Sequence, residues 1–563
     1  MNQDRKEILE YIQYNPKNEV LIIGAGINGI GTFRDLALQG VETLIVDRGD
    51  FCSGASMASS HMLHGGIRYL ENGEFRLVRE ALHERNNLLR NAPHLTHPLA
   101  TTIPIFKWFS GIFNAPMKFL GLLDRPAERG AVIIKLGLIM YDAYVRGDSP
   151  MPGHRVDNRS QALKKWPRLN PDLRYAATYY DGGMYSPERL ALEILLDGLA
   201  EGEQARALNY VSAVRSEGES VILRDEISGQ EFPVQPRIVI NAAGPWIDFV
   251  NQRIDGGSEF IGGTKGAHLI IDHPELREAL GDHEFFFEYV DGRIVLIYPY
   301  LDKVMIGTTD IRIDDPDQIE VTDEEVENIL GMAPYVLPGI NVTKEQRVFQ
   351  FTGVRPLPPA EGSTGQVSRD HAIEEIPAGE QAPWPILSLV GGKWTSYRAF
   401  SEQTTDRTLQ LLGKQRSRGT SDLPIGGGEN YPQEAAGKQA WIERLASETG
   451  HSTDQIQTWF ERYGTRIGDL ARTVQPGDPA LEYLGDYTRG EIQYLAEQEM
   501  ITRLDDFLLR RSLVAWMGRA TRPMINELAN VIGETLDWTE NRKRSEIDRT
   551  VKILQQDHGV TLE

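Results

Sequence analysis

The clearest hydrophobic pattern lies near the start of the chain. Residues 20–23 are continuously apolar, which predicts a buried parallel strand. A glycine-rich turn follows, residues 30–39 predict a helix that Gly40 ends, and residues 41–46 predict a second strand closed by Asp47. A strand, a turn, a helix and a strand in this order predict the start of a doubly wound α/β fold.

The turn carries the spacing Gly-x-Gly-x-x-Gly. Gly24 permits a tight turn, Gly26 lets the backbone approach a pyrophosphate, and Gly29 lets the helix pack closely on the strand. The amides at the start of the helix then face the phosphate anions. Asp47 can accept hydrogen bonds from ribose hydroxyls, and its charge disfavours a 2′-phosphate. These features together predict a dinucleotide-binding site rather than a merely structural turn.

The pattern changes after about residue 412. Before it, strands alternate with helices, and residues 295–300 and 303–307 predict a strand pair. The chain is expected to divide into a mixed α/β domain (1–412, in discontinuous halves), a linker (413–431) and a helical domain (432–563). Helices of the last domain are predicted over residues 433–448, 452–463, 489–497, 503–514 and 524–563.

Composition narrows the class of protein. The chain has 563 residues, of which 40% are hydrophobic, so it can bury a large core. Its net charge of −22 argues against nucleic acid as a partner. The single cysteine, Cys52, cannot form an internal disulfide, which favours a reducing compartment. A small packed residue is the favoured interpretation of Cys52, with a covalent or redox role as the alternative. No apolar run has the length of a membrane span, and no metal-binding motif occurs.

Residues 53–70, SGASMASSHMLHGGIRYL, are rich in serine, histidine and glycine. This run resembles the FAD-dependent glycerol-3-phosphate dehydrogenases, whose usual pattern here is close to SGTSSRSSKLIHGGLRYL. Further matching blocks follow in the same order at residues 75–82, 92–95, 181–183, 241–246, 264–268, 306–310, 353–357, 368–371 and 391–395. The resemblance covers nearly the whole chain.

The resemblance implies a fold and a cofactor. The implied fold is an α/β, FAD-binding doubly wound domain of the glutathione-reductase type with an interleaved antiparallel-sheet substrate domain, plus a C-terminal all-α domain. The implied FAD-contacting residues are Gly24, Gly26, Asn28, Gly29, Asp47, Arg48, Ser53, Ser59, Ser60, His64, Gly65, Gly66, Gly244, Trp246, Asp310, Gly392, Lys393, Trp394 and Thr395. In the C-terminal domain, Arg510 and Arg511 are expected to pack against the main domain, with anion binding as the alternative.

The implied reaction is oxidation of sn-glycerol 3-phosphate to dihydroxyacetone phosphate, with electrons passed to a membrane quinone. His268 is the candidate proton acceptor, because imidazole titrates near working pH; a structural histidine and a relay through Arg355 are the alternatives. Asp310 is expected to bond within the flavin pocket or to hold a catalytic arginine. The substrate phosphate needs several cations, and the implied substrate-binding residues are Arg68, Tyr69, Arg369 and Lys393.

Some positions depart from the family pattern. Met57, Ala58 and His61 replace residues that are usually Ser, Arg and Lys, and Trp394 stands where Leu is common. The departures at Met57, Ala58 and His61 keep open a dehydrogenase of another polyol phosphate, such as erythritol phosphate. The other two alternatives are an oxidase that reduces oxygen and a catalytically silent flavin-binding protein.

Residues 105–135 fit the family pattern least well. They combine large apolar side chains, among them Trp108, Phe109 and Phe113, with several basic residues. Such a composition suits a surface in the lipid headgroup region, where a quinone reductase meets its acceptor. The expected location is therefore the cytoplasm, attached peripherally to the inner face of the cell membrane. A subunit contact or a buried hairpin is the alternative, and a homodimer and a monomer both stay open.

Overall fold

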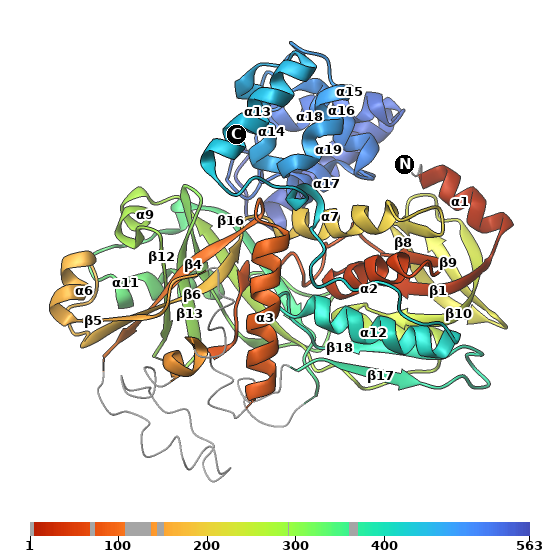
Figure 1. The fold of residues 1–563 in the computed structure, drawn as a ribbon, viewed down its shortest axis with the longest axis horizontal. Coiled ribbons are helices and arrows are strands. Elements are labelled where there is room, and N and C mark those ends of the chain that lie inside the picture. The colour runs from red at the N-terminus through yellow and green to blue at the C-terminus, as the bar shows by residue number, and fades with distance from the viewer. Residues whose placement is uncertain are drawn as a thin grey trace, which may run out of the picture.

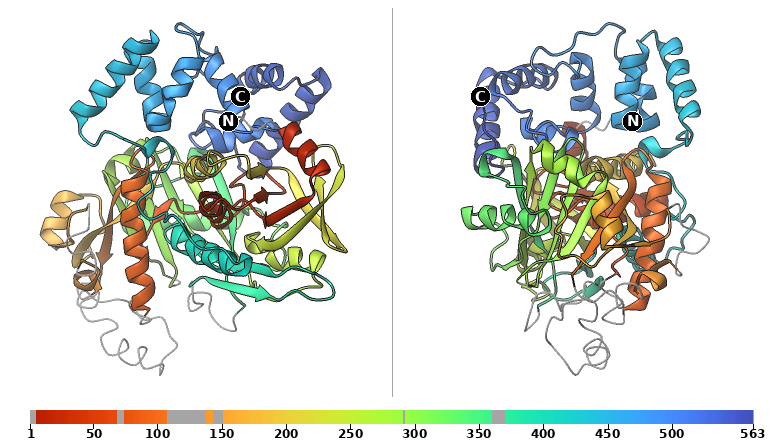
Figure 2. Two further views of the ribbon diagram at one scale, coloured as in Figure 1. Left: turned by 45° about the vertical axis from the view of Figure 1, so that its right-hand side comes forward. Right: turned by 90° about the vertical axis from the view of Figure 1, so that its left-hand side faces the viewer.

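A computed structural model describes residues 5–67, 74–106, 137–142, 151–290, 292–359 and 370–562 of the protein. Two sheets lie side by side, and the C-terminal helices sit together above one end of both (Figure 1). Figure 2 shows the same separation of the helices from the sheets in two further views.

The first sheet is built around the predicted strand of residues 20–23. Its strands, from edge to edge, are β17 (Ala372–Ile376), β18 (Ile386–Val390), β10 (Glu231–Asn241), β1 (Lys17–Ile23), β2 (Thr43–Val46) and β7 (Ala205–Leu208). The neighbours from β18 to β7 are parallel, and β17 is antiparallel to β18. A meander of β8 (Val211–Glu217) and β9 (Ser220–Asp225) continues from β10.

Successive residues of β1 face opposite sides of this sheet, which explains the continuous apolar run. Val20 and Ile22 pack toward one set of helices: α2 (Ile27–Leu38), α7 (Pro187–Leu199) and α12 (Tyr397–Leu412). Leu21 and Ile23 pack toward the meander, α1 (Arg5–Tyr14) and α8 (Ile247–Ile254). The sheet is therefore covered on both faces.

The second sheet is mostly antiparallel. Its strands, in order, are β15 (Ile311–Arg312), β11 (Thr264–Ile271), β14 (Lys303–Gly307), β13 (Ile294–Tyr300), β12 (His283–Glu288), β4 (Thr96–Ile105), β6 (Tyr175–Met184) and β3 (Met62–Leu63). Strand β16 (Arg347–Arg355) also pairs with β11, and β5 (Arg155–Asn158) with β6. The predicted strand pair is confirmed as β13 and β14.

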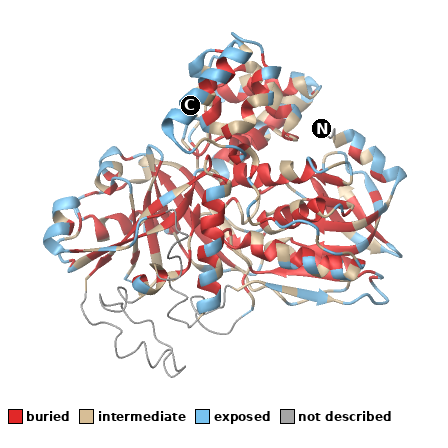
Figure 3. Cartoon of the chain, viewed as in Figure 1, coloured by how far each residue is buried: buried red, intermediate tan, exposed pale blue. Residues whose placement is uncertain are grey.

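Short helices and turns complete this part of the chain. They are α3 (Phe75–Asn91), α6 (Arg159–Lys165), η2 (Gly244–Trp246), α9 (Pro274–Leu280), α10 (Asp323–Leu330), α11 (Met332–Val336), η3 (Lys344–Gln346) and η5 (Gly426–Gly428). Buried residues fill both sheets and the facing sides of the helices (Figure 3). Within the described ranges, no helix combines the length and the hydropathy that crossing a membrane requires.

The C-terminal helices are α13 (Ala435–Thr449), α14 (Thr453–Tyr463), η6 (Gly464–Arg466), α15 (Ile467–Thr473), α16 (Arg489–Gln498), α17 (Leu504–Asp506), the π-helix η7 (Phe507–Arg511), α18 (Arg522–Thr535) and α19 (Glu540–Gln556). The predicted helices over 433–448, 452–463 and 489–497 are confirmed, and α15 was not predicted.

Two helix predictions in this domain are wrong. The segment 503–514 is a short α-helix and a π-helix that ends at Arg511, because Ser512 returns to extended backbone. The segment 524–563 is not one helix: Asp537 has a positive φ of 52°, and Thr539 caps a new helix by accepting the Arg542 amide at 3.2 Å. The domain boundaries at 412 and 431 stay predictions.

Candidate active site

The glycine turn between β1 and α2 has the close packing that its sequence predicts. A side chain at Gly29 would place its Cβ 2.0 Å from the Gly24 carbonyl oxygen, so only glycine fits there. The space at Gly26 is more open, because the nearest atom to a Cβ there is Ser56 Oγ at 3.2 Å. Backbone is thus exposed where a pyrophosphate would approach the start of α2.

Asp47 lies at the end of β2 and stabilises this turn. Its Oδ2 accepts the Ala25 amide at 2.7 Å and its Oδ1 accepts the Gly49 amide at 2.9 Å. Burial raises the pKa of Asp47 to about 6, although these two amides oppose the shift. Each carboxylate oxygen accepts only one of these bonds, so lone pairs stay available for ribose hydroxyls.

The loop of residues 53–66 joins two segments that lie far apart in the sequence. Ser56 Oγ accepts the Ile27 amide at 2.9 Å, at the start of α2. The Trp394 indole Nε1 donates to the Ser56 carbonyl at 2.8 Å, and Thr395 Oγ1 donates to the His64 carbonyl at 3.2 Å. The matched blocks at 53–66 and 391–395 therefore meet at the glycine turn.

Asn28 shows where a ligand would fit between these segments. Its Nδ2 donates to the Gly391 carbonyl at 3.2 Å, and Gly392, at φ +89°, leaves room for the side chain. Its Oδ1 is buried and accepts no hydrogen bond within the described residues. A bound group with a donor would satisfy this oxygen.

Arg48 and Trp246 lie together at the far side of the turn. The Arg48 guanidinium sits 4.3 Å from the Trp246 ring centroid and forms an ion pair with Asp317. The Trp246 Nε1 donates to Asp317 Oδ1 at 2.9 Å. Gly244 opens the short helix that carries Trp246. Asp317 was missed because nothing in its local pattern distinguishes it from a surface carboxylate.

Further candidate FAD contacts lie in the loop of residues 53–66. The Ser53 amide donates to the Asp50 carbonyl at 3.2 Å, and Ser59 Oγ accepts the His61 amide at 3.3 Å. The Gly65 amide donates to Asp181 Oδ1 at 3.1 Å and to the Tyr141 hydroxyl at 3.0 Å. Gly66 follows with a positive φ of 73°.

Buried Arg85 stabilises the loop of residues 53–66 through Asp181 and Tyr141. It donates to Asp181 Oδ1 at 3.1 Å and to the Tyr141 hydroxyl at 3.2 Å, the same two groups that bind the Gly65 amide. Sequence reasoning missed Arg85 and Tyr141; the only signal was that Asp181 belongs to a matched block. The side chains of Arg85, Asp181 and Tyr141 thus hold the Gly65 backbone in place.

His268 connects the second sheet to the same loop. It lies on β11, 2% exposed, and shares a hydrogen bond of 2.9 Å with Ser60 Oγ through Nε2. Its ring stacks on Phe351 at 4.9 Å, and its Nδ1 has no hydrogen-bond partner within the described residues. Gly307 on β14 makes room for it, because a Cβ there would lie 2.1 Å from His268 Cδ2.

Burial, with smaller contributions from Arg355 and His61, lowers the pKa of His268 to about 3. The ring is therefore neutral at physiological pH, and before a substrate binds it is a weak base. Its pKa lies well below the range that the sequence argument assumed. The negative charge of a bound phosphate ester would raise it.

Arg355 lies at the end of β16, opposite Thr264 of β11. Its Nη1 donates to Asp310 Oδ1 at 3.0 Å, and its Nη2 donates to Thr308 Oγ1 at 3.1 Å. The expectation that Asp310 holds an arginine thus has a direct counterpart in this ion pair. A carboxylate-bound guanidinium keeps its proton, which makes Arg355 a poor base and a good anion-binding group.

Lys393 lies in the turn between β18 and α12, within electrostatic reach of Glu80 and His371. The other predicted substrate-binding residues, Arg68, Tyr69 and Arg369, lie outside the described residues. Their roles, like those of all the site residues above, stay predictions.

Of the four departures from the family pattern, Trp394 donates to the loop of residues 53–66, and the other three lie in that loop. Met57 is buried in the core that includes the C-terminal helices, and Ala58 lies against Gly353. His61 lies between Tyr300, Phe351 and Trp516 of the helical domain, with ring centroids 5.1 to 6.1 Å apart. These residues adapt the loop to the helical domain that covers it.

Cys52 is buried and free, and burial raises the pKa of its thiol well above the ordinary value. Such a thiol forms little of the reactive thiolate, which supports the packing interpretation.

A parallel sheet with a dinucleotide turn, joined to an antiparallel sheet that carries a buried histidine, defines a flavin-dependent oxidoreductase. Residues 19–381 match the family model of the FAD dependent oxidoreductases, and residues 418–543 match that of the C-terminal domain of alpha-glycerophosphate oxidase. The chain therefore belongs to the FAD-dependent glycerol-3-phosphate dehydrogenase family, and FAD is its cofactor.

Individual relatives match nearly the whole of this chain. A glycerol-3-phosphate dehydrogenase of Synechocystis is 32% identical over 574 residues, covering 96% of this chain and 97% of that protein. The mitochondrial glycerol-3-phosphate dehydrogenase of mouse is 27% identical over 587 residues, covering 99% and 75%. The FAD complex of the Bacillus halodurans glycerol-3-phosphate dehydrogenase has the same fold, with a TM-score of 0.73, 23% sequence identity and 98% of both chains covered. The predicted fold class is thereby confirmed.

The Trp394 hydrogen bond to the flavin loop gives a first prediction. Trp394→Phe keeps an aromatic ring but removes the donor to the Ser56 carbonyl, so we expect FAD to dissociate about 2- to 10-fold more readily. The fluorescence of released flavin measures this change. Trp384→Phe is the matched control, because Trp384 is also buried and its Nε1 has no partner within the described residues. Equal FAD affinity in both variants would contradict the prediction.

Proposed function

We propose that the protein oxidises sn-glycerol 3-phosphate to dihydroxyacetone phosphate and passes the electrons to a membrane quinone. The observation that carries the proposal is the 2.9 Å contact between His268 and Ser60, because it joins a buried neutral base to the flavin loop. The relatives from Synechocystis and mouse, which match nearly the whole of this chain and bear the name glycerol-3-phosphate dehydrogenase, support glycerol 3-phosphate as the substrate.

Oxidation of a secondary alcohol requires removal of a hydride from carbon and a proton from oxygen. Bound FAD supplies the hydride acceptor. In this proposal His268 takes the hydroxyl proton at Nδ1, the nitrogen that Ser60 leaves free. Ser60 and Phe351 hold the ring in place, so the base is oriented before the substrate arrives.

The substrate phosphate is assigned to cations around this base. Arg355 is held by Asp310 and lies on the strand that pairs with the one carrying His268. Lys393, Arg369 and Arg68, with Tyr69, complete the set in the proposal. An arginine fork matches phosphate oxygens in geometry as well as in charge.

A substrate panel tests the assignment. We expect glycerol 3-phosphate to give the highest kcat/KM, with erythritol 4-phosphate well below it. The relatives from Synechocystis and mouse, which bear the name glycerol-3-phosphate dehydrogenase, favour this ranking. A higher kcat/KM for erythritol 4-phosphate would replace the proposed substrate.

The acceptor is tested by reoxidation. Flavin reduced by glycerol 3-phosphate is expected to recolour faster with a short-chain quinone than with dissolved oxygen at the same concentration. Faster recolouring by oxygen, with production of hydrogen peroxide, would assign the protein to the oxidases instead.

A membrane quinone requires contact with the bilayer, and we propose that residues 105–135 provide a peripheral attachment. Most of this segment lies outside the described residues, so its composition alone supports the proposal. We place the protein at the inner face of the cell membrane. Whether it acts there as a monomer or a homodimer does not alter this assignment.

Replacing Trp108, Phe109 and Phe113 with serine is expected to release the protein from anionic liposomes, since each apolar side chain contributes to insertion. Flavin reduction in solution should be unchanged. A matched control replaces three exposed aromatic residues elsewhere, Tyr14, Phe249 and Tyr483, with serine. If the variant at Trp108, Phe109 and Phe113 co-sediments with anionic liposomes as the parent does, residues 105–135 are not the anchor.

A further inference from the structure

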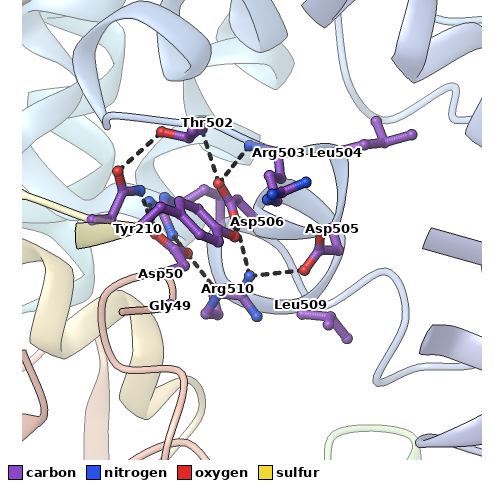
Figure 4. Close-up of polar contacts among 12 residues, drawn as sticks. Gly49, Asp50, Tyr210, Thr502, Arg503, Leu504, Asp505, Asp506, Leu509 and Arg510 are labelled. Carbon is purple, nitrogen blue, oxygen red and sulfur yellow. Dashed lines mark hydrogen bonds and ion pairs between the residues drawn. The ribbon is translucent and has the colours of Figure 1, made fainter. Parts of the chain in front are cut away.

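A buried cluster of charges joins the dinucleotide loop to the C-terminal helical domain (Figure 4). Asp50 lies on the loop that follows β2, three residues after Asp47, and its side chain is fully buried. Its Oδ2 accepts Arg510 Nε at 2.6 Å and Arg511 Nη1 at 2.5 Å, while its Oδ1 accepts Arg511 Nη2 at 3.0 Å and Asn209 Nδ2 at 2.9 Å. One carboxylate is thus bound by two consecutive arginines of another domain.

The two arginines are the last residues of the π-helix η7, which spans Phe507–Arg511. From these positions both guanidinium groups reach the same carboxylate. Single π turns occur frequently at functional positions of helices.

Arg510 is in turn bound by two carboxylates of its own domain. Arg510 Nη2 donates to Asp506 Oδ1 at 2.8 Å and to Asp505 Oδ2 at 3.2 Å, and the Tyr210 hydroxyl also donates to Asp506, at 2.6 Å. Burial alone would raise the pKa of Asp50, but the two guanidinium groups lower it below its ordinary value. Asp50 is therefore ionised and matched by fixed positive charge.

Asp50 is connected by short backbone links to the groups assigned to FAD. Its carbonyl accepts the Ser53 amide at 3.2 Å, and the next residue but one, Cys52, donates its amide to the Ala25 carbonyl of the glycine turn at 2.9 Å. On the other side, Val211 donates its amide to the Asp47 carbonyl at 2.6 Å. Residues 47–53 thus form a strap between the glycine turn and the helical domain.

A buried ion pair contributes little net stability compared with a packed apolar pair, because desolvation of the charges offsets their attraction. Replacing only one member of the pair is costly, since the other buried charge is left without its partner. These facts favour a role in fixing position over a role in raising stability.

We propose that Arg510 and Arg511 are positioning residues of the FAD site: through Asp50, the helical domain fixes the loop that carries Asp47 and Ser53 and so sets how tightly FAD is held. The inference rests on the proposed function only in taking FAD as the group that this loop binds.

The test compares two arginines of the same cluster in the full-length holoenzyme. Arg511→Met removes the bidentate contact to Asp50. The matched control is Arg549→Met, because Arg549 pairs with Asp505 and makes no ion pair with Asp50. After dilution, the fluorescence of released FAD is expected to rise at least about 10-fold faster for Arg511→Met and within about twofold of the parent for Arg549→Met. Equal release from both variants and the parent would overturn the proposal.

A second variant changes the same ion pair on the side of Asp50, in the main domain. Asp50→Asn keeps the shape of the side chain and removes its charge, so it should also accelerate FAD release. The double variant should release FAD more slowly than the product of the two single effects predicts, because both changes break one interaction. If the two single effects on the rate of FAD release simply multiply in the double variant, Asp50 and Arg511 do not act through one interaction. If Arg511→Met does not fold, Arg511→Lys takes its place in the cycle.

Activity with excess FAD separates positioning from general damage. With FAD restored to saturation, Arg511→Met should reduce its flavin with glycerol 3-phosphate at the parental rate and KM. A rate that stays low at saturation would overturn the assignment of a positioning role. A protein that holds FAD through Asp50 but does not react with glycerol 3-phosphate would contradict the proposed function alone.

Discussion

His268→Ala is expected to slow flavin reduction by glycerol 3-phosphate about 100-fold or more at neutral pH, because a positioned base contributes about 10²- to 10⁴-fold. The variant loses the only assigned acceptor for the hydroxyl proton. Partial recovery is expected at high pH, where hydroxide can take that proton. Stopped-flow absorbance of the flavin under anaerobic conditions measures the rate directly.

The matched control for this prediction is His451→Ala. His451 is also buried, but it lies in the helical domain, where its ring contacts the carbonyls of Ala471 and Val474 at 3.0 and 3.1 Å. Its removal should lower stability without slowing flavin reduction. If His268→Ala loses stability and keeps the parental rate, His268 is a structural residue.

Arg369→Ala is expected to raise the KM for glycerol 3-phosphate by about 30-fold to several thousand-fold while FAD stays bound. Removing one partner of a desolvated charge pair costs roughly 2–5 kcal/mol, and each 1.4 kcal/mol is about tenfold. Steady-state kinetics with a soluble electron acceptor measures the change. Arg369 lies outside the described residues, so the prediction rests on its matched block.

Arg407→Ala serves as the control for Arg369. Arg407 forms a bidentate surface pair with Glu375, both contacts at 2.8 Å, and has no assigned role in binding. Its replacement should leave KM unchanged, since exposed ion pairs contribute little. A parental KM in Arg369→Ala would remove that residue from the phosphate site.

Local patterns were sufficient to predict the core of the FAD domain. The apolar run of β1, the glycine turn and the helix after it each follow from neighbouring residues. The bounds differ: β1 begins at Lys17, α2 at Ile27 and β2 at Thr43. Ile30 donates its amide to the Gly26 carbonyl at 2.9 Å, so the helix begins within the glycine turn. This overlap brings the helix amides directly to the phosphate position.

Contacts between distant segments could not be predicted from such patterns. The pairing of Asp50 with Arg511 joins positions 461 residues apart. The sequence predicted that Arg511 packs against the main domain, which this contact confirms, but no local signal marked Asp50 as its partner. The same holds for Ser60 with His268, although both lie in blocks that match the family. In the helical domain, the apolar periodicity continues across the break before α19, so the sequence pattern predicted one helix. Thr539, the N-cap of α19, was the residue that could have indicated the new helix.

The most direct test of the account is an anaerobic titration of the yellow holoenzyme with glycerol 3-phosphate. Because the substrate carries one hydride and one proton to the site, the flavin absorbance should bleach with a stoichiometry of about one substrate per flavin, and dihydroxyacetone phosphate should accumulate in the same amount. A flavin that stays oxidised in excess glycerol 3-phosphate, while dithionite still reduces it, would contradict the proposed function.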